Sequence, residues 1–465
     1  MTGGHVPTAA TPTGSPDASL EGRVERLMPR LKEDLVRLSR IPSIAFPGFD
    51  RKPVLEAHDV VVELLREAGV QRVGALSLPE TAPVITGEIP APDGAPTVLL
   101  YAHYDVQPPG DERAWKTPPF EPTEHQGAIY ARGVADDKSN LIAHVGALRA
   151  FDGRPPVGIK VVFEGQEEYG SSFDEYPLAH PELFEADAIV IGDVGNMRPG
   201  DPTLTTDLRG DAEVIFEVRT LTEPKHSGDF GGPAPDALIV LLHALATLHD
   251  EHGDVAVAGL RREPWTGASY SEEEFRKLTG VEPGTPLFGS GSLGERLWSG
   301  PAITVMGLDA PPVETAAAAV VPYARAKLNL RVHPQQSATD AQAALVRHLE
   351  GCRPFGVSLT VTPLGGVGDG FSASTSGPAY AAARAALGRA WGRDVLTMAA
   401  GGAIPLASAL QRAVPEAEVL MFGAQDEYCN LHAPNERLLL DELRRTVFAE
   451  ALFFSEYATG KERPR

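Results

Sequence analysis

The feature that most constrains the fold of this chain is a series of short apolar segments that each run into polar residues. Three of them have the length and composition of buried strands: residues 97–101, 157–163 and 186–191. They are followed by His103, by Glu167 and Glu168, and by Asp193. Strands of this kind, separated by helical segments, predict a mostly parallel sheet flanked by helices. Functional sites in such α/β folds form at the carboxyl ends of the strands.

Helical spacing of apolar residues accompanies these strands. Val24, Leu27, Leu31, Leu35 and Leu38 predict a first helix, in which Pro29 marks either a kink or a start. Further helices are expected at 54–68, 141–151 and 379–391.

The pattern changes after Asp207. Strands are predicted at 212–219, 302–306, 324–332 and 357–361, and helices at 236–248 and 340–350. This βαββαβ order is the ferredoxin-like pattern, which indicates an α+β domain inserted into the first. We therefore expect a catalytic domain of residues 21–208 and 375–465 and an inserted domain of residues 209–374. The stretch 250–300 is irregular, and no element is predicted there.

Length and charge limit the classes of function. A chain of 465 residues favours two domains. A net charge of −22 argues against binding to nucleic acid or to an anionic membrane, and no apolar run is long enough for a transmembrane helix. Residues 1–20 lack the features of a secretory signal and are predicted to be a disordered tail. Two cysteines favour free thiols in a cytoplasmic protein.

Four short segments carry groups that bind metals or move protons. His103 and Asp105 lie two apart on a strand and point to the same side, which suits a metal-binding imidazole held by a carboxylate, although a polar strand end would look the same. Asp136 lies in a loop before a helix, where aspartates also serve as turn formers or caps. Adjacent Glu167 and Glu168 point to opposite sides in an extended chain, and such pairs also occur on solvated surfaces.

Asp193 and His432 are weak signals alone, yet the combined set of two histidines and several carboxylates suits zinc, with cobalt or manganese as alternatives. Two cations that share one bridging carboxylate would use all of these ligands.

The sequence offers poorer support for catalysis by a nucleophilic side chain. No Gly-x-Ser-x-Gly elbow is apparent at a strand-to-helix turn, and Cys429 is better explained as a small structural residue. The glycines of 365–370 lack the Lys-Ser/Thr of a phosphate-binding loop and favour a hinge.

Six motifs, in order, resemble those of the M20 metallopeptidases, most closely the carnosinase-like dipeptidases: HYDVQPP, ARGVADDKSN, EGQEEYGS, GDVGN, PKHSG and NLHAPNE. The resemblance extends over essentially the whole chain after the tail, and it implies a di-metal exopeptidase fold. It assigns the bridging carboxylate to Asp136, one metal to His103 and Asp193, and the other to Glu168 and His432. Asp105 would orient His103, and Glu167 would be the general base. The resemblance also implies a cis peptide bond between Asp136 and Asp137.

The resemblance makes the inserted domain a lid that also forms a homodimer. His226, in PKHSG, would contact the reacting carbonyl in the partner subunit. Arg331 would grip the carboxylate of the substrate, a task that suits the planar guanidinium, although a surface strand residue is the alternative. Gly402 lies in a segment that matches the substrate-binding Glu-Gly-Gly-Ser-Ile-Pro of many family members.

Several positions depart from the family pattern. Ala400 and Ala403 replace an acid and a hydroxyl, Ser139 replaces a glycine, and the threonine that usually precedes Val-Ile-Pro is absent near residues 319–322. A site built to pair a polar group discriminates strongly between substrates, so these changes bear on substrate preference and leave the metal set intact.

The sequence thus predicts a two-metal hydrolase that cleaves the amide bond of dipeptides or small peptides. Two cations about 3.5–4 Å apart lower the pKa of a shared water from about 16 toward 7, and Glu167 would accept its proton. The alternatives are an N-acyl-amino-acid or other specialised amidohydrolase on the same scaffold and a non-catalytic metal-dependent binding module. The intact Glu167 argues against the last, because a binding module needs no base.

Overall fold

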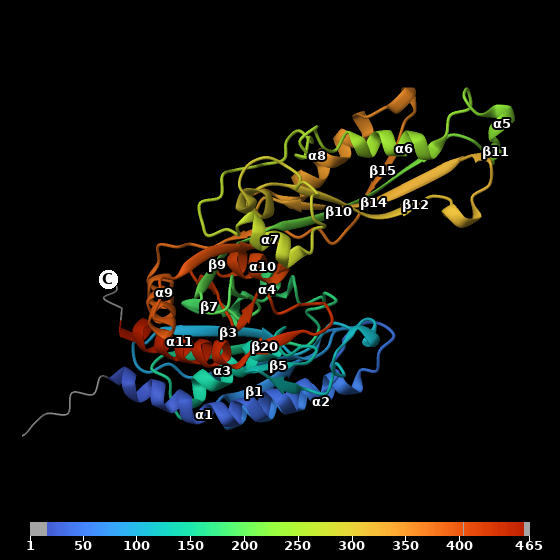
Figure 1. The fold of residues 1–465 in the computed structure, drawn as a ribbon. Helices are drawn as coiled ribbons and strands as arrows, with labels where there is room; N and C mark the ends of the chain where they lie inside the picture. The colour runs from blue at the N-terminus through green and yellow to red at the C-terminus, as the bar shows by residue number, and fades with distance from the viewer. Residues whose placement is uncertain (1–15, 403, 460–465) are drawn as a thin grey trace, which may run out of the picture.

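The structure, a computed structural model, describes residues 16–402 and 404–459. It has two domains, each built on its own sheet (Figure 1). The sheet of the larger domain has nine strands. In spatial order they are β1 (Gln71–Leu76), β2 (Val84–Ile89), β6 (Gly158–Glu164), β3 (Thr97–His103), β7 (Ala188–Ile191), β18 (Glu418–Met421), β9 (Thr203–Leu208) and β16 (Phe371–Ser372), with β17 (Leu396–Ala400) also paired to β9.

The four central strands of this sheet, β6, β3, β7 and β18, run parallel, which confirms the predicted parallel core. The pairs β1–β2, β2–β6, β18–β9 and β9–β16 are antiparallel, so the sheet is mixed toward both edges. The parallel register places the ends of β3, β6 and β7 at one edge, because His103 pairs with Glu164 and Tyr101 pairs with Ile191.

Alternate residues of the central strands face two separate apolar cores. One face of β3, with Val98 and Leu100, packs under a layer of helices: α1 (Pro16–Ser39), α2 (Lys52–Glu67), α3 (Lys138–Arg149), α9 (Pro378–Trp391) and α11 (Leu440–Thr459). The other face, with Leu99 and Tyr101, packs against α10 (Pro405–Ala413) and α4 (Tyr176–Ala179). Burial of both faces explains why these strands are continuous apolar runs.

The first helix differs from its prediction. It starts at Pro16, so the last five residues of the predicted tail 1–20 are helical, and residues 1–15 lie outside the described residues. Pro29 lies inside α1, which continues past it to Ser39. Among the described residues, no helix has the length and hydropathy that a membrane span requires.

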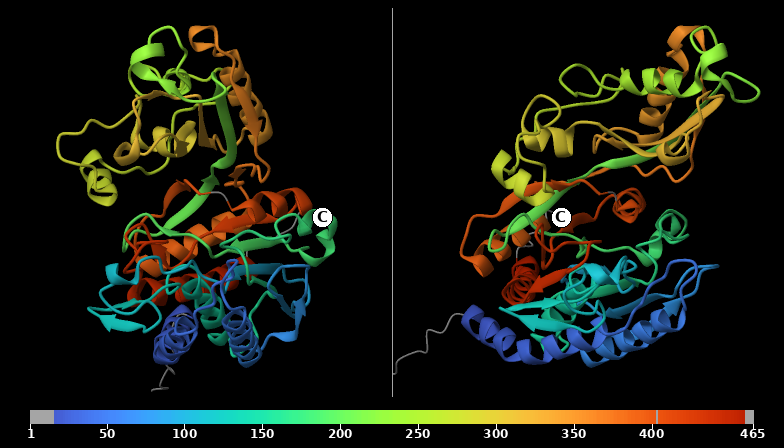
Figure 2. Two further views of the ribbon diagram at one scale, coloured as in Figure 1. Left: turned by 90° about the vertical axis from the view of Figure 1, so that its right-hand side faces the viewer. Right: turned by 45° about the vertical axis from the view of Figure 1, so that its right-hand side comes forward.

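The smaller domain has the predicted βαββαβ order. Its strands β10 (Gly210–Arg219), β12 (Ala302–Asp309), β14 (Tyr323–Val332) and β15 (Thr360–Pro363) pair antiparallel in the order β12-β14-β10-β15. Helices α6 (Ala237–Ala246) and α8 (Ala338–Gly351) contribute to its separate apolar core. We call this domain the lid; it projects away from the larger domain, and β10 leads into it directly from β9 (Figure 2).

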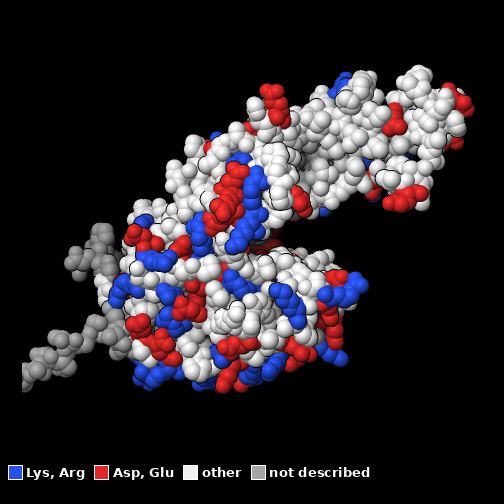
Figure 3. Space-filling model, viewed as in Figure 1, with Lys and Arg blue, Asp and Glu red and all other residues white. Residues whose placement is uncertain are grey.

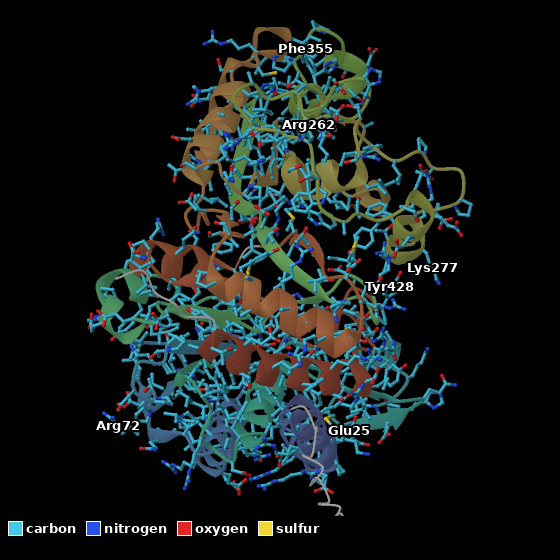
Figure 4. All side chains as sticks on the ribbon, turned by 90° about the vertical axis from the view of Figure 1, so that its left-hand side faces the viewer. Glu25, Arg72, Arg262, Lys277, Phe355 and Tyr428 are labelled. Carbon is cyan, nitrogen blue, oxygen red and sulfur yellow. The ribbon has the colours of Figure 1, made fainter. Side chains whose placement is uncertain are left out.

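The irregular stretch 250–300 forms a strap between the lid and the larger domain. Trp298 packs with Met197 and Met398 of the larger domain. Helix α7 (Glu272–Thr279) adds polar contacts, since Glu274 accepts a hydrogen bond from Tyr428 Oη at 3.2 Å and one from Arg198 Nη2 at 2.6 Å. Figure 4 labels Tyr428 and Lys277, the latter on the same helix. Residues 250–300, for which no element was predicted, therefore contact the larger domain and link it to the lid.

Candidate metal centre

The predicted ligands gather at the carboxyl ends of the central parallel strands. His103 is the last residue of β3, Glu168 follows β6 by four residues, and Asp193 follows β7 by two. Asp136 lies in the loop before α3, and His432 comes from the loop before β20 (Arg437–Leu439). The surface is hollowed between the lid and the larger domain, and acidic side chains line the inner end of this hollow (Figure 3).

Asp136 lies between the two histidines. Its Oδ1 is 3.1 Å from Nε2 of His103, and its Oδ2 is 3.0 Å from Nε2 of His432. Nε2 of His103 is also 3.7 Å from Oδ1 of Asp193, and Nε2 of His432 is 3.2 Å from Oε2 of Glu168. The arrangement matches two ligand sets that share one carboxylate.

The donor set fits divalent cations. Ligand atoms of His103, Asp136 and Glu168 all lie within 4.8 Å of one another, as do those of His103, Asp137 and Asp193. Imidazole nitrogen with carboxylate oxygen suits Zn²⁺ and the neighbouring transition metals. The geometry therefore supports divalent metal binding without distinguishing among these ions.

Asp137 was not predicted to be a ligand, although it belongs to one of these groups. Its Oδ2 accepts the backbone N–H of His103 at 3.1 Å, and its Oδ1 accepts Nδ2 of Asn140 at 2.6 Å. Both oxygens are thus engaged in holding the end of β3 against the start of α3. The peptide bond between Asp136 and Asp137 is cis, as the resemblance implied.

Asp105 organises two parts of the site. Its Oδ1 lies 3.3 Å from Nδ1 of His103, on the side of the ring away from Asp136. The same carboxylate accepts the backbone N–H of Glu167 at 3.0 Å and that of Glu168 at 3.2 Å. Asp105 therefore contacts the ring of His103 and holds the backbone of the glutamate pair, and its role in orienting His103 stays a prediction.

Burial, hydrogen bonds and neighbouring charges shift the pKa values of the groups in the site. Burial, together with the charge of Asp193, raises the pKa of Glu167 well above its usual value. Hydrogen bonds with Asp136 and Glu168 raise the pKa of His432 to about 10. Burial disfavours the charged form of Asp136, but hydrogen bonds with His103 and His432 outweigh burial and lower its pKa. A pocket with this excess of carboxylates favours bound cations.

The loop that carries Asp136 is held by Glu436, a residue for which the sequence analysis predicted no role. The buried carboxylate of Glu436 accepts four hydrogen bonds: from Arg132 Nη1 at 2.8 Å and from the backbone N–H groups of Gly133, Ala135 and Asp136 at 2.9, 2.9 and 3.1 Å. Glu436 closes the NLHAPNE motif, so its place in the motif was a signal. Its partners, some 300 residues away in the chain, could not be read from that signal.

Gln107 was missed as well. Its backbone N–H and its Nε2 donate to Oε1 and Oε2 of Glu168 at 3.2 and 2.8 Å. This pair of bonds fixes the carboxylate that faces His432. Gln107 lies in the HYDVQPP motif, but nothing in its spacing indicates this contact.

Within the described residues, none of the three predicted substrate-binding residues forms a hydrogen bond or ion pair with a metal ligand. His226 is in β11 (Lys225–His226), at the end of the lid remote from the larger domain (Figure 1), where it pairs with Ala319 of β13 (Ala319–Val320). Arg331 is on β14, with Nη1 3.0 Å from Oδ1 of Asp211. Gly402 is exposed and follows β17. Within one chain, the structure does not bring His226 to the metal centre.

Two further residues have structural explanations. Cys429 is buried, and burial raises the pKa of its thiol well above the usual value, which agrees with a structural cysteine. Ser139 is buried in the first turn of α3, where Oγ donates to the carbonyl of Ala135 at 2.9 Å. The departure from glycine at 139 therefore adds a bond within the metal-binding loop.

The model of peptidase family M20/M25/M40 matches residues 99–454 of this chain. The chain belongs to this family. This assignment confirms the resemblance carried by the six motifs, and it makes the protein a metal-dependent peptidase.

Individual members of the M20 family are similar to this chain over most of their length. A cysteinylglycine-S-conjugate dipeptidase of Corynebacterium striatum is 39% identical over 410 residues, which span 86% of this chain and 90% of that protein. The crystal structure of human carnosine dipeptidase 1 has a TM-score of 0.79 at 25% identity, covering 96% of this chain and 100% of the other. The dipeptidase Dug1p of Saccharomyces cerevisiae has a TM-score of 0.81 at 23% identity, covering 97% and 99%, and supports the fold.

Proposed function

We propose that this M20 protein is a dipeptidase in which Glu167 is the general base and Asp136 bridges two divalent cations. The observation that carries the proposal is the placement of Asp136 between His103 and His432, each backed by a second carboxylate. Substrates of the relatives, named as cysteinylglycine conjugates and as the dipeptide β-Ala-His, favour dipeptides.

The chain supplies the groups that amide hydrolysis needs. Two cations held by these ligands would polarise the scissile carbonyl and make a water molecule acidic. Among the described residues, no imidazole or side-chain donor engages the carboxylate of Glu167, so it is available to take a proton from water and deliver it to the leaving nitrogen. Asp105 holds the backbone of Glu167, which keeps the base in a fixed position.

We propose further that the active protein is a homodimer formed through the lid, in which His226 acts on the site of the partner. The position of His226 at the remote end of the lid supports a role outside its own chain. Arg331 and Gly402 would bind the substrate within the same chain, near the junction of the two domains.

The lid carries a surface suited to such a dimer, which we call the β12 edge. Strand β12 is at one end of the four-stranded sheet, so one side of its backbone has no neighbouring strand within the described residues. Its apolar residues Val305, Met306 and Leu308 are exposed, as are Ile239 and Leu242 on α6. An exposed apolar edge strand favours pairing with another chain.

Zn²⁺ is the proposed metal, with Mn²⁺ and Co²⁺ as alternatives, because the ligands are imidazole and carboxylate. A cytoplasmic location is proposed because both cysteines are free thiols. The proposed partners are a small peptide or amide substrate and a second copy of the chain, with no nucleic acid and no membrane.

A substrate panel with each metal tests the function. Purified protein is stripped of metal, reloaded with Zn²⁺, Mn²⁺ or Co²⁺, and assayed with dipeptides, including Cys-Gly and β-Ala-His, and with N-acylated amino acids. Turnover of dipeptides that disappears in Glu167→Ala is the expected result. Turnover of acylated amino acids alone would identify the specialised amidohydrolase instead, and no turnover by metal-loaded protein would indicate a binding module.

A further inference from the structure

Arg209 occupies the single-residue junction between the two sheets. Strand β9 ends at Leu208 and β10 begins at Gly210, so Arg209 is the point at which the chain leaves the larger domain for the lid. Its backbone N–H donates to the carbonyl of Ala400, the last residue of β17, at 3.3 Å. This contact places Arg209 beside the segment 400–402.

Two of the three guanidinium nitrogens of Arg209 are enclosed without an acceptor from the part of the chain that the structure describes. Its Nε and Nη1 are buried, and within residues 16–402 and 404–459 they have no hydrogen-bond partner. A guanidinium carries five N–H donors and stays charged in proteins. Burial of such a cation without acceptors is unfavourable, so an unpaired buried guanidinium calls for an explanation other than packing.

The nearby charges do not satisfy Arg209. Its neighbour Arg331 is also a cation, and burial, together with the charge of Arg331, lowers the pKa of Arg209 to about 10. The carboxylate close to both is Asp211, whose Oδ1 already receives Nη1 of Arg331 at 3.0 Å and Nδ2 of Asn329 at 2.7 Å. Two guanidinium groups thus share one carboxylate, which leaves a net positive charge at the junction.

The remaining side of the guanidinium faces a stretch of chain without side chains. A Cβ atom placed on Gly401 would lie 3.4 Å from Nη2 of Arg209, and one placed on Gly402 would meet no atom within 4 Å. The glycines leave room for a small anionic group next to Nη2. Ala400, where many relatives have an acid, adds no carboxylate that could neutralise Arg209.

We propose that Arg209 is a second substrate-binding cation, which grips the carboxylate of the substrate together with Arg331. The inference rests on the proposed dipeptidase function and deepens it. A planar guanidinium binds a carboxylate through two parallel hydrogen bonds. The carboxylate of the substrate would supply acceptors for the guanidinium N–H groups of Arg209 that have none in the described residues. Substrates with a free carboxyl terminus would therefore be preferred over the corresponding amides.

Two variants, Arg209→Met and Arg209→Lys, test the proposal. The matched control is Arg347→Gln, at an exposed position of α8. Steady-state kinetics with metal-loaded protein compare Cys-Gly with its carboxyl-terminal amide. We expect Arg209→Met to raise KM for the acid by about tenfold or more with kcat changed by less than about threefold, and to leave the amide unaffected. Arg209→Lys should retain part of the preference, and the control should match the wild type.

Thermal unfolding gives a second measurement. Since Arg209→Met removes an unpaired buried charge, its melting temperature should equal or exceed that of the wild type. A purely structural arginine would instead lower the melting temperature and weaken the acid and the amide alike, and either of those results would overturn the proposal.

Calorimetric titration separates this inference from the proposed function. If the wild type cleaves no dipeptide, the proposed dipeptidase function is wrong. The role of Arg209 is then still tested by measuring how wild type and Arg209→Met bind glycylglycine and its amide. Weaker binding of glycylglycine by the variant, with unchanged binding of the amide, would support the carboxylate contact. Equal binding by both proteins would refute it.

Discussion

Asp136 contacts both histidines of the metal centre, whereas Glu167 contacts neither through its side chain. This difference predicts that Asp136→Ala and Glu167→Ala both lose turnover, but that only Asp136→Ala also loses bound metal. Asp136→Ala should remove activity and most of the bound metal, because both ligand sets lose their shared oxygen donor. Glu167→Ala should lower kcat by at least about a hundredfold, the usual range for a general base, and keep its metal. Metal analysis alongside turnover tests the difference, and equal metal loss in both variants would contradict the assignment.

Glu436 acts on the centre through the backbone of the Asp136 loop. Glu436→Ala leaves three backbone N–H groups and Nη1 of Arg132 without their acceptor. We expect metal affinity to fall by about 10–100-fold, as is common when an outer support of a metal ligand is lost. A competition titration with a chelator measures this, with the exposed Glu21→Gln as control.

Partial retention of metal affinity in Glu436→Gln would support the positioning role, because the amide keeps one acceptor oxygen. Unchanged affinity in Glu436→Ala, with only a lower melting temperature, would show that Glu436 serves folding alone.

The sequence motifs identify candidate ligands that the structure brings together, but they do not identify the residues that support those ligands. The sequence motifs contain the metal-binding types of side chain directly, as at His103, Asp136 and His432. Glu436 and Gln107 act through contacts with distant backbone or with a neighbouring carboxylate, and no local pattern encodes such contacts. The substrate-binding roles of His226, Arg331 and Gly402 stay predictions.

Among the elements, the β12 edge carries the clearest testable consequence. Met306 is 58% exposed on a strand with one unpaired side among the described residues. Met306→Glu would place a charge in the proposed interface, so it should shift the protein from dimer to monomer and reduce turnover as the partner's contribution to each site is lost. Sedimentation velocity over a range of concentrations measures the shift.

The control for this variant is Phe288→Glu, which changes an exposed aromatic residue of the strap outside the β12 edge. It should leave the association state unchanged. A wild-type protein that is monomeric and fully active would contradict the role of the edge.

Regular elements were predictable because their periodicity is local. Helix 379–391 and strand 324–332 lie within one residue of α9 and β14. The antiparallel edges of the large sheet and the strap were not predictable. Strand direction depends on how distant segments pair, and the strap is fixed by contacts such as Trp298 with Met398 rather than by its own repeat.

For the whole molecule, the position of His226 predicts that two inactive variants restore each other. His226→Ala retains Glu167, and Glu167→Ala retains His226. A mixed dimer would therefore contain one complete site. If subunits exchange freely, half of the dimers are mixed and each has one complete site of two, so activity should recover to about a quarter of the wild-type value. Turnover is measured after mixing under conditions of proven exchange.

Complementation requires that subunit exchange be shown independently, for example with one fluorescently labelled variant. Exchange without any recovery of activity would place the action of His226 within its own chain or outside catalysis. Each variant incubated alone through the same procedure provides the baseline.

The two histidines of the centre also differ in their access to water. The imidazole of His103 is fully buried, whereas 55% of the His432 side chain is exposed. An ion beside His432 would meet solvent directly, and an ion beside His103 would lie behind it. A chelator should then withdraw the two ions in separate kinetic phases, with a half-loaded form between them. Such a protein would keep the ion beside His103 and would rebind an ion beside His432 from the divalent cations in solution. Its activity would therefore depend on the concentration of divalent metal around it.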